Sequence, residues 1–434
     1  GNPADTNSDG AGSVPGSGNW GGIYYDEVSD DANCLLRNCQ LRYGSSTAGN
    51  YGMVYSSSAA PNFIDCTFDV AGHGLGAYGS SQPYVENCTF DNMTSTPVCM
   101  SLISDPVFTG CEFGSGNAYN ALGIHGETLA QDVTIRRRDL AQMANVPYLL
   151  LGHVIAGYSS VLTIEPGVII KGTGSNITIR RGLMAEGGTD QDDQIVFTSV
   201  TDDFYGGDTN NDGSATAPSQ TRWGRIIIEN ETIDDQARIS NAVFRYGYNS
   251  NSYGTIEINS ANPKIENCLF AYNGIALDYQ GTSGDPLEGW IRDCDFQNNT
   301  YYAVRNMGTA FTVDATENWW GDSDPSDNDN NSGSGSINYY HWYMDAAMTL
   351  MSNQRVYNVT QGSWYETIQA AIDAASAGQT VRVLSGTYIE DLFINKANLE
   401  MKGAGPTSII QGVQRVNAWP LAAPNIDIQG DDVE

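Results

Sequence analysis

Short segments in which apolar and polar residues alternate recur along the chain, and most of them end at Asn, Asp or Gly. The clearest pattern reads Pro, any residue, apolar, any residue, Asx, Cys, any residue, Phe. It starts at Pro61, at Pro83 and, with Gly110 in the Asx position, at Pro106, so the steps are 22 and 23 residues. Because alternation with a period of two marks a strand with one buried face, the pattern predicts short, regularly repeated strands.

The Cys and Phe positions of this pattern are expected to form ladders. In a solenoid whose coils are about 4.8 Å apart, like residues at equivalent positions stack on one another. We expect small buried thiols and not disulfides, because a disulfide needs Cβ atoms only about 3.5–4.5 Å apart. Cys34 and Cys99 lie outside these ladders. The expected ladders are Cys39, Cys66, Cys88 and Cys111; Cys268 and Cys294; and Phe68, Phe90 and Phe113.

A longer repeat contains the shorter one. Residues Asp5–Gly44 match Asp208–Gly247 at a constant offset of 203 without a gap, and Trp20 thereby matches Trp223. A leucine-rich repeat has a similar short period, but its Leu ladder is absent here. The two repeats together predict an all-β fold, a parallel β-helix or solenoid.

Changes of pattern divide the chain into three predicted segments. Residues 1–127 are the C-terminal coils of a first β-helix unit. Residues 128–351 are a second unit that ends at the NWWG box, Asn318–Gly321. Residues 352–434 are the cap and first coils of an incomplete third unit, with a short helix near 364–375. Ser363–Glu366 is a capping-box pattern, and the helix that follows places Ile368, Ala371, Ile372 and Ala375 on one face before Gly378.

The charge of the chain excludes two classes of partner. It has 51 acidic and 20 basic residues and a formal net charge of −31. Such a surface repels nucleic acid and anionic membranes and attracts cations. No run of about 18 apolar residues occurs, so we expect no membrane span.

Three motifs carry a resemblance to a known class: the series around LTIEPGVIIKG at Leu162–Gly172, the NWWG box, and the segment YETIQAAIDAASAGQTVRVLSGTY from Tyr365. The chain resembles the right-handed parallel β-helix proteins of the pectin lyase-like class, specifically the large bacterial secreted or cell-surface type. The resemblance implies an extracellular or cell-surface location. It does not select an activity, because the fold carries both enzymes and non-enzymatic proteins.

The strongest chemical signal is a DxNxDG loop that occurs twice. Oxygen ligands at alternate positions with a following Gly are typical of the first half of an EF-hand loop, which predicts a structural Ca²⁺ site. The Glu of the EF-hand's twelfth position is missing, so Asp202 or Asp203 would have to complete the second site. An Asx-rich turn without an ion is the alternative. The predicted metal ligands are Asp5, Asn7 and Asp9 in the first loop and Asp208, Asn210 and Asp212 in the second.

Other candidates have simpler interpretations. Asp322, Asp324, Asp327 and Asp329 form an acidic loop, which is either solvated or a second cation site. Trp319 and Trp320 are interpreted as a cap over the interior, with a sugar platform as the alternative. The Gly72–Gly74 triplet resembles one polygalacturonase element without its companion motifs, and Arg136–Arg138 is expected to be solvated or paired with acids. His125, His153 and His341 lack metal-ligand spacing, and we predict no catalytic or cofactor-binding residues.

The sequence therefore favours a non-enzymatic extracellular structural or adhesive protein, a rigid acidic rod that associates head to tail or belongs to a longer array and contacts surface glycans. The alternative is a polysaccharide-active enzyme, a lyase, hydrolase or epimerase, or a glycan-binding module of the same fold.

Overall fold

The computed structural model describes residues 12–45, 52–218, 223–248, 250–281, 289–308, 311–322, 335–339, 341–352, 355–384, 386–403, 408–412 and 428–430. The chain divides into two compact units. The first comprises Gly1–Ala315 and Asn328–Asn338, and the second comprises Thr316–Asp327 and Tyr339–Glu434. Among the described residues, no helix has the length and apolar character needed to cross a membrane.

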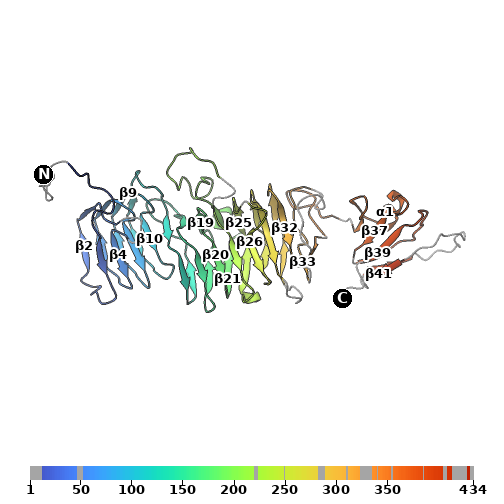
Figure 1. The fold of residues 1–434 in the computed structure, drawn as a ribbon, viewed down its shortest axis with the longest axis horizontal. Coiled ribbons are helices and arrows are strands. Elements are labelled where there is room, and N and C mark those ends of the chain that lie inside the picture. Colours follow the sequence, from blue (N-terminus) through green and yellow to red (C-terminus); the bar gives the residue numbers. More distant parts are fainter. Residues whose placement is uncertain are drawn as a thin grey trace. The chain divides into compact units, whose positions relative to one another are not determined.

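In the first unit the strands of the coils pair in parallel with strands three places later, except where a sheet ends, so three strands make one coil (Figure 1). One eleven-stranded sheet, here called the long sheet, contains every third strand. Its strands are β1 (Ile23–Tyr25), β4 (Val54–Ser57), β7 (Leu75–Tyr78), β10 (Val98–Met100), β13 (Leu122–Ile124), β16 (Tyr148–Leu150), β19 (Ile169–Gly172), β22 (Ile195–Ser199), β25 (Ala242–Arg245), β28 (Leu269–Ala271) and β31 (Asp295–Gln297).

Two further sheets complete the N-terminal coils. One contains β2 (Leu35–Arg37), β5 (Asn62–Ile64), β8 (Tyr84–Glu86) and β11 (Val107–Thr109), and the other contains β3 (Gln40–Arg42), β6 (Thr67–Ala71), β9 (Thr89–Met93) and β12 (Glu112–Phe113).

Different sheets complete the later coils. One contains β14 (Glu127–Leu129), β17 (Val154–Ala156), β20 (Ile177–Ile179), β23 (Ile226–Ile228), β26 (Gly254–Asn259), β29 (Ile275–Gln280) and β32 (Tyr302–Asn306). The other contains β15 (Val133–Ile135), β18 (Val161–Ile164), β21 (Gly182–Glu186), β24 (Ala237–Ser240), β27 (Lys264–Glu266) and β30 (Trp290–Arg292). Outside these sheets, β33 (Thr312–Asp314) pairs with β34 (Ser336–Asn338), and η1 (Gln191–Asp193) and η2 (Asp234–Gln236) are single 3₁₀ turns.

These pairings confirm the predicted all-β, parallel β-helix fold. The flanking sheets change close to the predicted segment boundary at residue 127, because one pair ends at β11 and β12 and the next begins at β14 and β15. The long sheet continues across this change, since β13 pairs directly with β16. Segments 1–127 and 128–351 therefore share one continuous sheet, and their division remains a prediction about sequence repeats.

The longer repeat is out of phase with the coil. The offset of 203 residues places β1 on β23, which is 22 strands later among the described residues. Seven coils of three strands account for 21 of these, so one strand remains. Equivalent strands consequently lie in different sheets: β1 belongs to the long sheet, whereas β23 pairs with β20 and β26.

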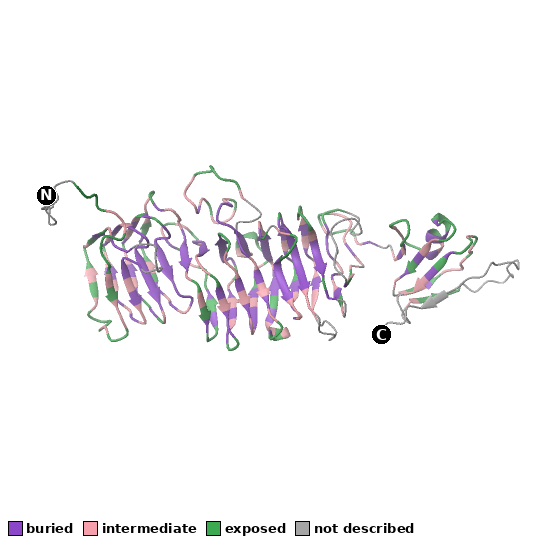
Figure 2. Ribbon diagram, in the orientation of Figure 1, coloured by how far each residue is buried: buried purple, intermediate pink, exposed green. Residues whose placement is uncertain are grey.

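Interior ladders connect the coils, and Figure 2 shows that the buried residues of the first unit lie mainly along its strands. Phe197, Phe244, Phe270 and Phe296 are at most 1% exposed and stack with centroid distances of 4.9, 4.9 and 5.3 Å. The predicted stack of Phe68 and Phe90 is present at 4.8 Å, but Phe113 lies edge-on at 83° where its sheet ends. The predicted stack is therefore wrong at Phe113.

Both predicted cysteine ladders are confirmed as columns of free thiols. Cys66, Cys88, Cys111, Cys268 and Cys294 are buried, and Cys39 is half-buried in the first coil. Each thiol donates to a carbonyl two residues earlier and, in the buried members, to one in the preceding coil. Cys66, for example, donates to Ile64 O at 3.3 Å and to Leu36 O at 3.5 Å. Cys34 and Cys99 are also free.

The residue before each ladder cysteine adopts the left-handed conformation, which explains why this position is Asn, Asp or Gly. Its φ is 53° at Asp65, 50° at Asn87 and 62° at Gly110. Asn and Asp tolerate this region better than other non-glycine residues, and Gly adopts it freely. The turn therefore selects the residue types from which the repeat was recognised.

The second unit combines parallel and antiparallel pairs. It contains β35 (Val356–Asn358), β36 (Ser363–Tyr365), α1 (Ile368–Ala374), β37 (Thr380–Val383), β38 (Gly386–Ile389), β39 (Glu400–Gly403), β40 (Ser408–Gln411) and β41 (Ile428–Gly430). β35 pairs antiparallel with β36 and β37, whereas β37, β39 and β41, and likewise β38 and β40, pair in parallel.

The predicted short helix is confirmed, but its predicted start is wrong. Ser363 lies in β36, and the residue that caps α1 is Thr367, whose Oγ1 accepts from the Ala370 amide at 3.1 Å. The Glu390 carboxylate accepts from two further amides of the first turn of α1, those of Ile368 and Gln369, both at 3.0 Å. The predicted apolar face of Ile368, Ala371, Ile372 and Ala375 is buried.

The Phe ladder predicts that truncating a buried ring lowers the free energy of unfolding much more than truncating an exposed ring does. Phe244→Ala removes a ring stacked on both sides, so we expect the free energy of unfolding to fall by about 3–5 kcal/mol. The control Tyr158→Ala removes a ring that is 62% exposed and should change it by less than about 1 kcal/mol. Urea unfolding measures the free energy of unfolding of both variants. Equal decreases would contradict a stabilising role for the interior Phe ladder.

Candidate cation site

Residues 200–218, here called the excursion, follow β22 and lie on the outer face of the long sheet. Near its start, Val200 packs against Ala121 and Leu149. Tyr205 packs against an apolar row that includes Val196. The excursion therefore covers apolar side chains that would otherwise face solvent.

Hydrogen bonds attach the excursion to an earlier coil. The Asn211 Nδ2 atom donates to the carbonyl oxygens of Ser115 and Asn117, at 2.6 and 2.9 Å. The amide of Asn120 donates to Thr209 O at 2.8 Å. Because these partners are more than 80 residues apart in sequence, the contacts fix the excursion across the stack.

A lysine lies buried beneath the excursion. Lys171 in β19 points outward from the long sheet and is fully buried. Its ammonium group donates to Asp202 O at 2.9 Å and to Gly207 O at 3.0 Å. Burial lowers the pKa of Lys171 to about 8, against the attraction of neighbouring carboxylates.

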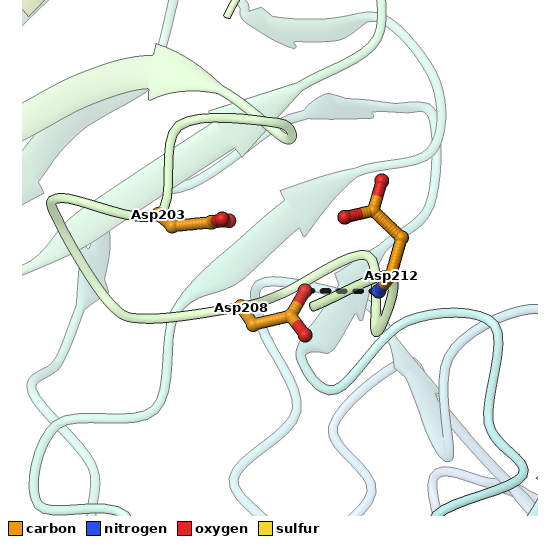
Figure 3. A group of neighbouring side chains, drawn as sticks. All are labelled: Asp203, Asp208 and Asp212. Carbon is orange, nitrogen blue, oxygen red and sulfur yellow. Dashed lines mark hydrogen bonds between the residues drawn. The ribbon is translucent and has the colours of Figure 1, made fainter. Parts of the chain in front are cut away.

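Three carboxylates of the excursion converge. Asp203, Asp208 and Asp212 each offer an oxygen, and these atoms all lie within 4.8 Å of one another. Figure 3 shows the three side chains around a shared space. Burial and the nearby Asp208 raise the pKa of Asp203. Like charges at this separation repel unless a cation lies between them.

The geometry favours Asp203 over Asp202 as the additional candidate ligand. Asp202 is 2% exposed, and its Oδ2 accepts from Thr198 Oγ1 at 2.6 Å and lies 3.5 Å from Arg245 Nη1. Its carboxylate is therefore neutralised by protein. The Oδ1 atom of Asp203, in contrast, is buried without a hydrogen-bond partner among the described residues.

The loop itself is held by its own hydrogen bonds. The Asp208 carboxylate accepts from the amides of Asp212 and Gly213 at 3.1 and 2.8 Å. Hydrogen bonds, with that from Thr216 the largest contribution, lower the pKa of Asp212. Asn210 Nδ2 donates to Asp212 Oδ2 at 2.7 Å, which leaves Asn210 Oδ1, a buried carbonyl oxygen without a partner in the described part of the chain.

These groups suit a hard divalent cation. Three carboxylates against the single charge of Lys171 leave a local charge of about −2, and carboxylate and amide oxygens are the ligands that Ca²⁺ prefers. Asp208, Asn210 and Asp212 were identified from sequence and lie together. The other predicted ligands, Asp5, Asn7 and Asp9, lie outside the described residues, as do Asp324, Asp327 and Asp329 of the acidic loop.

The NWWG tryptophans are buried in the second unit. Trp319 is 8% exposed and Trp320 is 1% exposed. Tyr339 contacts Trp320 and Trp342 edge-on at 6.2 Å in both cases. Buried rings leave little surface for a sugar, so the burial argues against the sugar-platform alternative.

The predicted acid pairing of the arginine run is confirmed. Arg136 and Arg138 both pair with Asp105, at 2.9 and 2.5 Å, and Arg137 pairs with Asp193 at 3.0 Å.

The histidine of the Gly72–Gly74 triplet is a structural residue. His73 is 1% exposed and its Nδ1 lies 2.8 Å from Thr96 O. Burial lowers the pKa of His73 to about 4, so it is neutral at pH 7.

Two charged residues of this region escaped sequence reasoning. From the sequence, Lys171 is expected to face solvent, because it occupies an outward position of an alternating strand. Nothing in that strand indicates that residues about 30 positions later cover it. Arg245 lies within 6 Å of four aromatic rings. The repeated Arg-Tyr pair, Arg42-Tyr43 and Arg245-Tyr246, was a visible signal for a cation–π contact.

A family model of a right-handed beta helix region matches residues 17–182. That range runs from the segment before β1 to the start of β21. No curated protein and no solved structure matches the chain.

Burial of Lys171 predicts a pH dependence. The folded pKa of about 8 lies below the ordinary value of 10.5, so between these values the unfolded chain binds more protons and the free energy of unfolding rises with pH. Relative to Lys171→Met, the wild type should gain about 3 kcal/mol from pH 8 to pH 10.5, at about 1.4 kcal/mol per pH unit.

Urea unfolding of both proteins at intervals across this range, with EDTA present, measures the difference. The comparison cancels groups that titrate in both. Parallel pH profiles would show that Lys171 is hydrated and that the excursion does not cover it.

Proposed function

Because the chain is a right-handed parallel β-helix repeat protein, we propose that it is a non-enzymatic extracellular structural or adhesive protein. The observation that carries this proposal is the long sheet, which runs through eleven strands and across both copies of the repeat. Each coil contacts mainly its neighbours, so such a stack is lengthened by adding coils without a new core. The net charge of −31 makes it an acidic scaffold.

We further propose that Asp203, Asp208 and Asp212 bind one Ca²⁺, with Asn210 Oδ1 as an additional ligand. The convergence of three carboxylates and the unpaired Oδ1 atoms of Asp203 and Asn210 support it. The ion would fasten the excursion over Lys171 and the apolar row of the long sheet. Its role is structural, since it holds a loop and the proposal requires no reaction at the ion.

The Ca²⁺ proposal predicts that Asp208→Asn binds one ion fewer than the wild type. The Asp212 and Gly213 amides donate to different carboxylate oxygens of Asp208, so the substitution keeps an acceptor for one of them and removes one ligand charge. Asp235→Asn is the control, because its carboxylate is 83% exposed, pairs with Lys264 and is not in the cluster. Isothermal titration with Ca²⁺ measures the stoichiometry.

Limited proteolysis gives a second readout. Ca²⁺ should slow cleavage within residues 200–218 about tenfold or more in the wild type and in Asp235→Asn, but not in Asp208→Asn. Equal stoichiometry in all three proteins, or a Ca²⁺ effect that survives Asp208→Asn, would contradict the site.

A cleft beside the excursion favours a second candidate function, glycan binding. It has a volume of about 300 Å³, and its wall includes Phe204, which is 68% exposed. Arg245 makes a cation–π contact with that ring, with its Cζ atom 5.2 Å from the ring centroid. Sugars stack on exposed aromatic faces, and polar side chains at the rim can bond their hydroxyl groups. The polar lining is Arg137, Asn145, Gln191, Asp192 and Gln194.

Screening the purified chain against acidic and neutral glycans tests both glycan binding and the absence of turnover. A binding module predicts retention of one glycan class that falls at least about tenfold in Phe204→Ala but not in Tyr158→Ala. The structural proposal predicts no turnover. Depolymerisation that single carboxylate or Arg substitutions abolish would contradict it and support the enzyme alternative.

A further inference from the structure

The chain contains two copies of one coil, and the structure shows them in different surroundings. At the offset of 203 residues, β1, β2 and β3 fall on β23, β24 and β25. The inward residues Ile23, Leu36 and Leu41 thereby match Ile226, Ile239 and Phe244. The second copy therefore shows how this sequence packs where another coil precedes it.

The second copy is covered on its N-terminal side by β20, β21 and β22. In that contact Ile177 pairs with Ile226, Ala185 with Ile239, and Phe197 with Phe244. All three inward residues of the covered coil are 0% exposed. The backbone is also joined, because Ile177 N donates to Arg225 O at 3.0 Å and Glu229 N donates to Ile179 O at 2.9 Å.

The corresponding side of the first copy is open in the described structure. Trp20 is 37% exposed and Leu35 is 47% exposed, whereas Trp223, the counterpart of Trp20, is 0% exposed. Ile23 and Leu36 are only partly buried. A hollow of about 520 Å³ lies at this side and is lined by Trp20, Ile23, Leu36, Cys39, Gln40, Leu41 and Arg42.

We propose that the open side of β1, β2 and β3 is an interface for one further β-helix coil whose three strands carry the inward pattern of β20, β21 and β22. This inference rests on the proposed structural role and names the partner of the scaffold. The contact continues the interior that already joins the coils, and the second copy shows its register. Docked in that register, the last strand of the incoming coil would lie on β3, as β22 lies on β25.

The partner is identified by its pattern of inward side chains. Apolar residues at the positions of Ile177, Leu183 and Phe197 would extend the interior, with parallel backbone pairing along β1, β2 and β3. A coil that carries charges at these positions would bury them without partners, which is strongly unfavourable. Charges on its outward positions would remain in water.

The repeat defines a direct experiment on the full chain. A copy of Lys171–Gly207 is joined in front of Asp5 in place of the first four residues, because Asp5 matches Asp208. The added copy then enters β1 through the same loop as in the second repeat. Hydrogen exchange measured by mass spectrometry should be about tenfold slower or more for the amides of β1, β2 and β3.

Two variants of the added copy serve as controls. Ile177→Asp, Leu183→Asp and Phe197→Asp in the copy should remove the protection, whereas Thr178→Asp and Met184→Asp, which lie at outward positions, should keep it. Equal protection by both copies, or by neither, would overturn the inference. A loss of protection at the distant strands β28 and β31 would overturn it too, because a docked coil stabilises the stack.

These outcomes are independent of the Ca²⁺ stoichiometry, which compares Asp208→Asn with the chain as it stands. Failure of the added coil to dock leaves that measurement unchanged. If the cation site fails, the hydrogen exchange of β1, β2 and β3 can still be measured. The two proposals are therefore tested separately.

Discussion

The parallel pairing of strands three places apart is the constraint on which the rest of the first unit depends. It fixes a coil spacing of about 4.8 Å and places like residues on one another. Flat rings such as Phe244 and small thiols such as Cys66 meet that spacing without a break in the backbone ladder. Any extra length of chain must therefore leave the coil at a turn and lie outside it.

The excursion is the consequence of this constraint at the outer face of the long sheet. Its residues cover an apolar row and the buried ammonium group of Lys171, and it is attached through Asn211 to a coil formed about 95 residues earlier. Arg245 compensates Asp202, but Asp203, Asp208 and Asp212 converge beside a single basic side chain among the described residues, that of Lys171. A bound Ca²⁺ would remove the imbalance that this arrangement leaves.

The sequence predicts what local turns and ladders determine. The Asx position before each cysteine identified the coils because a left-handed turn restricts the residue there, and the apolar face of α1 was visible in its spacing. Contacts between distant segments were not visible. The burial of Lys171, the choice of Asp203, the edge-on Phe113 and the Thr367 cap each depend on residues that arrive from elsewhere in the chain. The shift of one strand between the two repeat copies was also not visible, because it emerges only when the strands between the copies are counted.

We propose that a divalent cation fastens the excursion to the coil stack as a cover. A crystal structure of the full chain grown with Tb³⁺ in place of Ca²⁺ tests this most directly, because anomalous scattering locates the ion without reference to the protein. A bound ion should give a peak about 2.3–2.6 Å from the carboxylate oxygens of Asp203, Asp208 and Asp212, with Asn210 Oδ1 turned toward it. An ordered excursion with no peak among these residues would contradict the proposal.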